Sequence, residues 1–535
     1  MTDSNLKVAR YTGIVMAATL ICRILGLGRE VVISNQFGAG FEADAFFVAF
    51  MIPNLLRSLI GEGALNTAFV PVFSGYLAHQ DKEKADGFAS KVINLLVITL
   101  IIIISLGVWA APSIVNMIAL GFKNYPEKYQ LTVRLTKIMF PYIGFTSLAA
   151  LFMGILNSYG VFFIPALAPA MLNIGIILFA LFYTTRFGIY SLAIGVMAGG
   201  LFQVLIHIPS LLKKNFHYHI SLNIYNQEVG LFFQLLIPAI IGLAIDKINF
   251  VVDRIIASFL ATGSISALYY ANRLMQFPLG VFGIALTVAI LPTLSKYVAK
   301  GQLAEMRDSF SFGFKLLSFF TWPSMVGLIV LSYPVVRLFY EHGLFSAQDT
   351  SITQVALVCY TVGLFATAIL RLVISTFYAL KDTRTPLRVG MLAVAINIIL
   401  DLILVRFLAH AGIALATSVS AILHLIILGV YLDKKVKGIF SNGLMVFSWK
   451  SLLASIFMAL TCWGTARYIG LKLDLSSKIF QMAQVLISGL LGISVYYFGG
   501  IMLGIKEFRN AREMIKLIIN RKMRELDKNV STDQN

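Results

Sequence analysis

The chain has 535 residues, of which 58% are hydrophobic and only 13% are charged, and its formal net charge is +18. Soluble domains average about 45–50% apolar and about 25% charged residues, so this composition excludes a chain of several soluble domains. A basic chain can bind nucleic acid, but at this hydrophobicity the excess of Lys and Arg is more typical of the loops of an integral membrane protein.

Apolar segments follow one another along almost the whole chain. Residues 138–185 contain no Asp, Glu, Lys or Arg, and the run from Asn157 to Gly160 predicts a turn between two spans. Similar runs occupy 92–122, 187–212, 274–295, 316–336, 351–370, 407–432, 451–466 and 479–505, and less pure ones occupy 11–33, 42–60, 228–258 and 386–406. Because a span needs about 20 apolar residues, we expect an all-α integral membrane protein with about 14 transmembrane helices.

Basic residues gather in alternate connections between these segments. The even-numbered connections hold Lys82, Lys84, Lys213, Lys214, Lys296, Lys300, Arg307, Lys381, Arg384, Arg388, Lys434, Lys435 and Lys437. The connections at 261–264 and 409–412 contain neither Lys nor Arg. Cytoplasmic loops are the ones enriched in Lys and Arg, so both termini are expected in the cytoplasm. The basic tail from Lys506 onward is typical of an amphipathic helix at the headgroups, and no nucleic-acid partner is expected.

The two halves of the sequence resemble each other. Arg29 and Arg254 match at the same offset as Pro53 and Pro278, and 68–71 pairs with 289–292 further on. Asn173 and Asn397 then match at the same offset as 188–189 and 412–413. Two repeats of six spans are typical of an alternating-access transporter. We therefore expect two pseudo-symmetric six-helix lobes at 1–212 and 213–433, two further spans at 434–505 and a cytoplasmic tail at 506–535.

A small set of charges lies inside the predicted spans, where charge is costly and marks candidate functional sites. The arginines of this set are Arg23, Arg29, Arg57 and Arg273. Gly26 and Gly28 are expected to let the first helix bend and turn its arginines inward. Guanidinium groups bind phosphate oxygens in pairs, which favours an anionic, phosphate-bearing substrate. The alternative is that these side chains snorkel or pair with Asp44, Glu62 and Asp253.

A second polar set lies in the other half. Asn397 and Asp401 are four residues apart and share one helix face, Thr417 follows on the next span, and Asp253 lies on the first span of that half. These oxygen donors suit Na⁺, or a proton carried by a carboxylate. The alternative is a satisfied hydrogen-bond bridge or an Asp253–Arg254 pair.

Signatures of enzymes are missing from the sequence. The seven histidines show no HExxH spacing, and there is no P-loop. No serine elbow indicates a hydrolase either. A transporter without intrinsic ATP hydrolysis and without a resident cofactor is therefore expected, with Na⁺ or H⁺ as the coupling ion.

Several motifs resemble those of one known family. Pro53-Asn54-Leu55-Leu56-Arg57, Gly61-Glu62-Gly63-Ala64-Leu65, Ala68-Phe69-Val70-Pro71, Asp44-Ala45-Phe46-Phe47 and Tyr269-Tyr270-Ala271-Asn272-Arg273 are similar to the signature of the MurJ (MviN) lipid II flippases. The similarity runs to about residue 505 and extends to the wider multidrug/oligosaccharidyl-lipid/polysaccharide exporter superfamily. Glu30 stands where an Asp is common in the family, and Asn272 where some members carry an acid.

The resemblance implies a function and a set of site residues. Family members move the lipid-linked peptidoglycan precursor to the outer leaflet of the bacterial plasma membrane. The implied substrate-binding residues are Arg23, Arg29, Arg57, Arg273, Asp44 and Glu62. The implied sodium site consists of Asp253, Asn397, Asp401, the Ile413 carbonyl and Thr417. The expected partners are lipid II, membrane lipids and the cell-wall synthesis machinery, with the protein acting as a monomer.

Two other functions compete with this prediction. A polysaccharide-lipid or drug exporter of the same superfamily would share the fold. A membrane-embedded enzyme or scaffold acting on polyprenyl phosphates would need a carboxylate–metal cluster in a cytoplasmic loop, which the sequence does not contain.

Overall fold

The structure is a computed structural model that describes residues 3–59, 65–79, 81–219, 230, 234, 236, 247–505 and 507–508. Every regular element in these ranges is a helix, which confirms the predicted all-α class. Ten of the helical segments in the described part are long and apolar enough to cross a membrane. The described residues of the predicted spans 11–33 and 42–60 are helical but carry the buried charges discussed below, and 228–246 is largely outside the described residues. The total of 14 spans therefore stays a prediction.

Contacts divide the chain into two compact units. Unit 1 comprises Met1–Arg273, Phe339–Ala356 and Val394–Thr417, and unit 2 comprises Leu274–Leu338, Leu357–Ala393 and Ser418–Asn535. The predicted boundaries at 212, 433 and 505 stay a prediction, and the tail predicted at 506–535 lies outside the described residues apart from 507–508.

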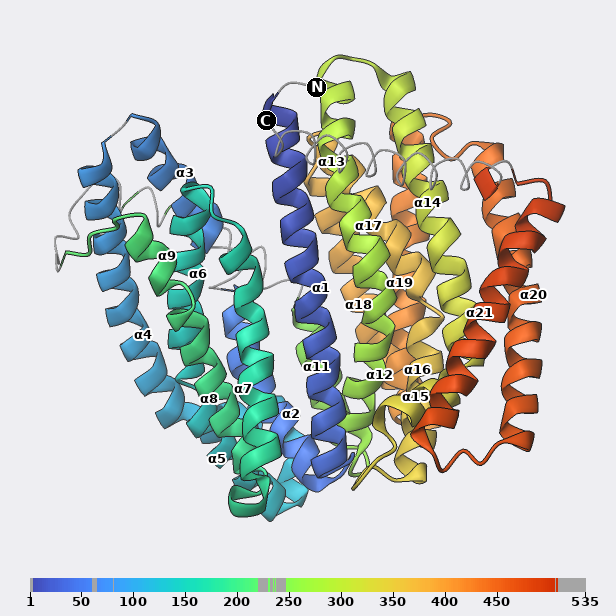
Figure 1. The fold of residues 1–535 in the computed structure, drawn as a ribbon, viewed down its shortest axis with the longest axis horizontal. Coiled ribbons are helices and arrows are strands. Elements are labelled where there is room, and N and C mark those ends of the chain that lie inside the picture. The colour runs from blue at the N-terminus through green and yellow to red at the C-terminus, as the bar shows by residue number, and fades with distance from the viewer. Residues whose placement is uncertain are drawn as a thin grey trace, which may run out of the picture. The chain divides into compact units, whose positions relative to one another are not determined.

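Unit 1 contains the amino-terminal helices. In chain order they are α1 (Asp3–Phe37), α2 (Phe41–Leu59), α3 (Leu65–Ala78), α4 (Lys82–Ile118), η2 (Leu120–Asn124), α5 (Pro126–Met139), α6 (Tyr142–Ser158), α7 (Phe163–Phe187), α8 (Tyr190–Leu205), α9 (Ile208–Lys213), α11 (Ile248–Ala257) and most of α12 (Ser264–Pro278). Figure 1 follows the chain through these helices from blue to green. The turn predicted at 157–160 separates α6 from α7, and Gly160 there has a φ of 75°.

Unit 2 contains most of the later helices. They are η3, a π-helical turn (Leu279–Ile284), then α13 (Ala285–Ala299), α14 (Leu303–Val330), α17 (Leu364–Ala379), α20 (Asn442–Lys472) and α21 (Lys478–Met502). Four further helices contribute residues to both units: α15 (Ser332–Tyr340), α16 (Ala347–Thr361), α18 (Arg384–Leu408) and α19 (His410–Lys435).

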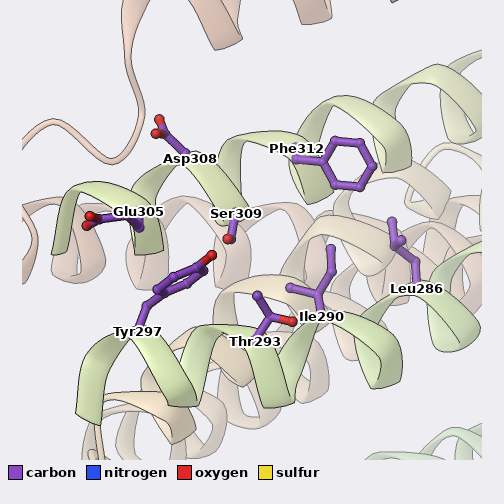
Figure 2. Close-up of a pocket in the computed structure, with 8 residues that line it drawn as sticks. All are labelled: Leu286, Ile290, Thr293, Tyr297, Glu305, Asp308, Ser309 and Phe312. Atoms are coloured by element: carbon purple, nitrogen blue, oxygen red, sulfur yellow. The ribbon is translucent and has the colours of Figure 1, made fainter. Parts of the chain in front are cut away.

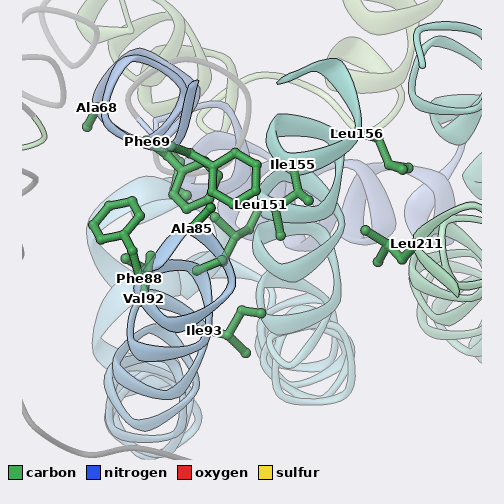
Figure 3. Close-up of a cluster of buried hydrophobic side chains, with 13 residues drawn as sticks. Ala68, Phe69, Ala85, Phe88, Val92, Ile93, Leu151, Ile155, Leu156 and Leu211 are labelled. Atoms are coloured by element: carbon green, nitrogen blue, oxygen red, sulfur yellow. The ribbon is translucent and has the colours of Figure 1, made fainter. Parts of the chain in front are cut away.

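An apolar core holds the first helices of unit 1 together. Phe69 and Phe88 are almost fully buried and stack with ring centroids 5.4 Å apart, which joins α3 to α4. Leu151 and Ile155 of α6 pack against the same cluster, as Figure 3 shows. Aromatic pairs of this kind add to the stability that burial alone provides. The core therefore fixes α3, α4 and α6 as one packed group.

Two helical hairpins, α7–α8 and α18–α19, share several local features. α7 and α18 are both 25 residues long, and each carries a buried asparagine, Asn173 or Asn397. Each helix ends at a residue with positive φ, Gly188 at 53° and Ala409 at 49°, before α8 or α19 begins. The register differs, however: Asn173 and Asn397 are 224 positions apart, whereas the positive-φ residues Gly188 and Ala409 are 221 positions apart.

Candidate functional site

Glu30 joins two of the predicted arginines in unit 1. Its side chain is fully buried in α1, where a neighbouring Arg29 guanidinium donates a hydrogen bond to Oε1. The Nε of Arg273, from α12, lies 3.7 Å from the same oxygen. Two guanidinium groups thus share one carboxylate, which leaves one positive charge in excess. In surroundings of low dielectric, such an excess attracts an anion strongly.

Tyr269 fixes this group from the side of α12. Its hydroxyl accepts a hydrogen bond from Arg29 Nη2 at 3.0 Å and donates one to Glu30 Oε1 at 3.1 Å. Its ring stacks on Phe47 of α2, with the ring centroids 3.9 Å apart. The group is therefore held by three helices, and its orientation is set before any ligand arrives.

The two arginines differ in their access to a ligand. Arg29 is 5% exposed, whereas the side chain of Arg273 is 37% exposed. Arg273 also lies against α1, because a Cβ added to Gly26 would be 2.5 Å from its Nη2. Helix α1 continues unbroken through Gly26 and Gly28, where the sequence suggested a bend. Gly26 instead makes room for a guanidinium group from another helix.

The other two predicted arginines lie on the same pair of amino-terminal helices. Arg23 is half-buried in α1, six residues and therefore about 9 Å along the axis before Arg29. Arg57 is in the last turn of α2, and its Nε donates to Asn54 Oδ1 at 3.0 Å. Arg23 and Arg57 therefore lie on α1 and α2, and the Glu30 carboxylate links Arg29 to Arg273.

Asp44 is placed in a network of its own. Its carboxylate is 1% exposed and lies 2.7 Å from the Lys128 ammonium of α5. It also accepts hydrogen bonds from Gly263 N, Ser266 N and the Ser266 hydroxyl, at 2.8, 2.9 and 2.6 Å, at the start of α12. A carboxylate there caps the helix and matches the sign of its dipole. Glu62, the remaining predicted acid, lies outside the described residues.

Two of the predicted cation ligands, Asp253 and Asp401, are neighbours in a second part of unit 1. The carboxyl groups of Asp253 in α11 and Asp401 in α18 are close enough to interact electrostatically. Asn397 and Asp401 are 1% and 0% exposed on one face of α18. Among the described residues, five buried atoms of this group have no hydrogen-bond partner: Asp253 Oδ1, both Asp401 carboxylate oxygens, and the amide oxygen and nitrogen of Asn397. Buried polar atoms without partners are rare in folded proteins, so this cluster is suited to a ligand.

The remaining two predicted ligands lie on the next helix, α19. The Thr417 hydroxyl donates to the Ile413 carbonyl at 3.0 Å, one turn earlier in α19. The turn between α18 and α19 is so tight that a Cβ added to Gly412 would lie 2.4 Å from the Leu404 carbonyl oxygen. The suggested Asp253–Arg254 pair competes with other contacts, because Arg254 Nη1 donates to the Ile265 carbonyl at 3.1 Å.

The sequence did not predict the roles of two residues in these networks, Lys128 and Tyr269. Lys128 lies in a polar stretch where a lysine is ordinarily exposed, so nothing marked it as the partner of Asp44. Tyr269 was noted only as part of a motif. Its role depends on Glu30, which is 239 positions away in sequence. Pro126 at the start of α5 was the one available signal that a helix begins before Lys128.

Similarity to known proteins decides the family. The sequence profile described as "Lipid II flippase MurJ" matches residues 33–482. The chain belongs to the lipid II flippase MurJ family. A "Probable lipid II flippase MurJ" of Vibrio cholerae is 34% identical over 499 residues, covering 92% of this chain and 94% of that protein. A "Lipid II flippase MurJ" of Burkholderia cenocepacia is 31% identical, covering 92% and 96%.

Solved structures agree with this assignment. A structure titled "Lipid II flippase MurJ, inward closed conformation" is 32% identical and superposes with a TM-score of 0.75, covering 93% of this chain and 99% of that chain. An inward-facing multidrug resistance MATE transporter reaches a TM-score of 0.67 at 14% identity, covering 81% and 99%, and shares the fold. Membership in the MurJ family makes the chain a multi-pass transporter of the bacterial inner membrane rather than an enzyme.

Proposed function

We propose that this MurJ family member moves lipid II, the undecaprenyl-diphosphate-linked peptidoglycan precursor, from the inner to the outer leaflet by alternating access. The substrate identity rests on the family, whose described relatives are lipid II flippases. The transport mode is supported by the fold that the chain shares with an inward-facing multidrug transporter.

The observation that carries the proposal is the shared carboxylate of Glu30. Arg29 and Arg273 together exceed its charge by one, and the side chain of Arg273 is 37% exposed. In this proposal Arg273 contacts the diphosphate, because a guanidinium group offers paired donors to phosphate oxygens. Arg29 and Tyr269 hold Glu30, so they act as positioning residues for Arg273. Arg23 and Arg57 add positive charge on α1 and α2.

Replacement of Arg273 tests this assignment. We expect Arg273→Ala to fail to support growth of a strain depleted of its own flippase, and lipid II to accumulate in the inner leaflet. Arg406→Ala is the matched control, because Arg406 is an exposed arginine in the last turn of α18. Protein abundance is measured for both variants. Normal growth of the strain that expresses Arg273→Ala at the normal level would show that Arg273 does not bind the diphosphate.

We also propose that a small cation, Na⁺ or H⁺, couples to transport at the Asp253–Asp401 pair. Two neighbouring carboxylates repel each other unless a proton or a cation lies between them. Carboxylate, amide, hydroxyl and carbonyl oxygens are the donors that hard cations prefer, and the unpartnered atoms of Asn397 and Asp401 are available. The cation would offset the negative charge of the carboxylate pair. Its ligands would be Asp253, Asn397, Asp401, Thr417 and the Ile413 carbonyl.

Transport measured against Na⁺ at fixed pH, and against pH at fixed Na⁺, separates the two cations. Asp401→Asn and Asp253→Asn are each expected to remove the dependence on the coupling ion. Asp433→Asn, which changes an exposed carboxylate of α19, is expected to keep it. Unchanged transport and unchanged ion dependence in both buried variants would make the pair structural.

Orientation and assembly complete the proposal. The Lys- and Arg-rich connections support cytoplasmic termini. Fusions of a reporter to either end, active only in the cytoplasm, test this. The Glu30 group and the Asp253 group both lie in unit 1 of a single chain, which supports function as a monomer. Lipid II delivered outside is a substrate for polymerisation, so contact with the cell-wall synthesis machinery is part of the proposal.

A further inference from the structure

A groove on unit 2 has features that the transport site does not use. It lies between α13 and α14, with a volume of about 560 Å³. Its lining residues are Leu286, Ile290, Thr293, Tyr297, Glu305, Asp308, Ser309 and Phe312. Figure 2 shows that the first four come from α13 and the last four from α14. The two helices touch at Gly313, where an added Cβ would lie 2.5 Å from Ile290 Cδ1.

The groove is apolar in one part and acidic in another. Leu286, Ile290 and Phe312 form the apolar part, and Phe312 is 53% exposed. Glu305 and Asp308 carry negative charge near the beginning of α14, and both are exposed. A ligand that fits this surface combines an apolar face with positive charges.

The end of the described chain is fixed beside this groove. Phe508 is fully buried, with its ring centroid 4.7 Å from that of Phe319 and 5.1 Å from that of Tyr496. The Lys315 ammonium lies 2.6 Å from Glu507 Oε1. The segment that follows Phe508 therefore starts on the surface of α14.

One stripe of α14 connects this anchor to the groove. Asp308, Phe312, Lys315 and Phe319 follow the i, i+4, i+7, i+11 spacing of a single helix face. Phe319 and Lys315 hold the chain end, whereas Phe312 and Asp308 line the groove. Moving along this stripe from Phe319 to Asp308 covers about 16 Å.

The sequence beyond Phe508 matches the groove in chemistry and in length. Residues 509–524 contain six Arg and Lys residues and one acidic residue, together with Met514, Ile515, Ile518 and Ile519 on the spacing of a helix face. If this segment binds as a helix antiparallel to α14, the residues 11 and 14 positions after Phe508 lie beside Asp308 and Glu305. Those residues are Ile519 and Lys522.

We infer that the α13–α14 groove is a docking site for the chain's own basic carboxy-terminal segment, residues 509–524. The apolar face of the segment covers Ile290 and Phe312, and Lys522 meets the charge of Glu305. Docking links the α13–α14 hairpin to the end of α21 within unit 2.

Cysteine cross-linking of the full-length protein in membranes tests the docking. The free cysteines Cys22, Cys359 and Cys462 are first replaced by Ala. We expect the pair Ser309→Cys and Ile518→Cys to cross-link within one chain about tenfold more than the pair Arg307→Cys and Ile518→Cys, since a docked tether raises the local concentration at one face only. Arg307 is the matched control because it is an exposed residue of α14 on another face. Equal yields, or cross-links that join two chains, would overturn docking within the chain.

Charge reversal and truncation provide independent readouts. Glu305→Lys is expected to lower the cross-link yield, and Lys522→Glu in addition is expected to restore it. Removal of residues 509–535 is expected to raise the labelling rate of Ser309→Cys by a membrane-impermeant thiol reagent about tenfold, since the tail no longer covers the groove. A labelling rate that stays the same after truncation means that lipid fills the groove or that it is open, and contradicts the inference.

Discussion

The Lys128 ammonium lies 2.7 Å from the Asp44 carboxylate, and the two side chains are only 3% and 1% exposed. The carboxylate also accepts two backbone N–H groups and a hydroxyl group at the start of α12. Gly263, which supplies one of these N–H groups, has a φ of 94°, and an added Cβ there would lie 2.4 Å from the Ala39 carbonyl oxygen. One carboxylate thus joins α2, α5 and α12, which places Asp44 in the framework that holds the Glu30 group.

Removal of the lysine from this pair is expected to destabilise the protein strongly. Lys128→Met leaves the Asp44 charge buried without its counter-ion, which typically costs about 3–5 kcal/mol of folding free energy. Thermal unfolding in detergent measures the loss. Lys84→Met is the control, because the Asp81–Lys84 pair is exposed and should show no measurable change. Equal unfolding temperatures for the two variants would contradict the structural role of the buried pair.

Gly26 allows a test of the position of the Arg273 guanidinium group without a substitution of Arg273. In Gly26→Ala the new Cβ takes the space of Arg273 Nη2, and the guanidinium group must move because it is the flexible end of a side chain. We expect the affinity for lipid II to fall about tenfold, which corresponds to about 1.4 kcal/mol. Binding to the purified protein measures the change.

Gly28→Ala is the matched control for this experiment. It lies on the same helix, and nothing is within 4 Å of its added Cβ. Both variants gain helix propensity from the replacement of Gly by Ala, so stability should not fall in either. Equal affinities for lipid II in the two variants would show that the position of Arg273 does not matter.

The sequence predicts the individual helices better than it predicts the contacts between them. Apolar run length predicts α4, α6 and α7, because a span must satisfy its backbone within the helix whatever surrounds it. Glu30, in contrast, was seen as a departure from a family pattern rather than as the link between Arg29 and Arg273. That link depends on how α12 packs on α1, which no local pattern encodes.

The proposed cation site predicts a specific effect of Thr417. Thr417→Val removes one oxygen ligand, so the Na⁺ concentration for half-maximal transport should rise about tenfold if Na⁺ is the coupling ion. Thr367→Val is the control, because the Thr367 hydroxyl makes the same kind of bond, to the Gly363 carbonyl at 2.8 Å. Both variants lose an equivalent helix-internal bond, so unequal ion dependence reports ligation. An equal response of both variants to Na⁺ would remove Thr417 from the site.

Asp382 makes the stability of unit 2 sensitive to acid. Its carboxylate lies 2.5 Å from the Lys435 ammonium and accepts bonds from the Thr385 backbone N–H and hydroxyl, at 3.0 and 2.9 Å. These contacts, with Lys435 the largest, lower the pKa of Asp382 to about 2. The unfolded carboxyl titrates near its usual pKa of about 3.9, so the stabilisation is complete above about pH 4. It is lost as pH falls through the folded pKa.

The expected size of this effect is modest because water screens the pair. The Lys435 side chain is 41% exposed and that of Asp382 is 17% exposed, so we expect about 1 kcal/mol of stability between pH 7 and pH 2. Asp382→Asn should lose this contribution at neutral pH and show a shallower decline on acidification, measured by thermal unfolding in a nonionic detergent. Asp433→Asn, an exposed carboxylate on the same helix as Lys435, should keep the wild-type profile. Identical profiles of stability against pH for Asp382→Asn and the wild-type protein would show that the Asp382–Lys435 pair contributes nothing to stability. The reason is that a lowered pKa of Asp382 must add acid sensitivity between pH 7 and pH 2.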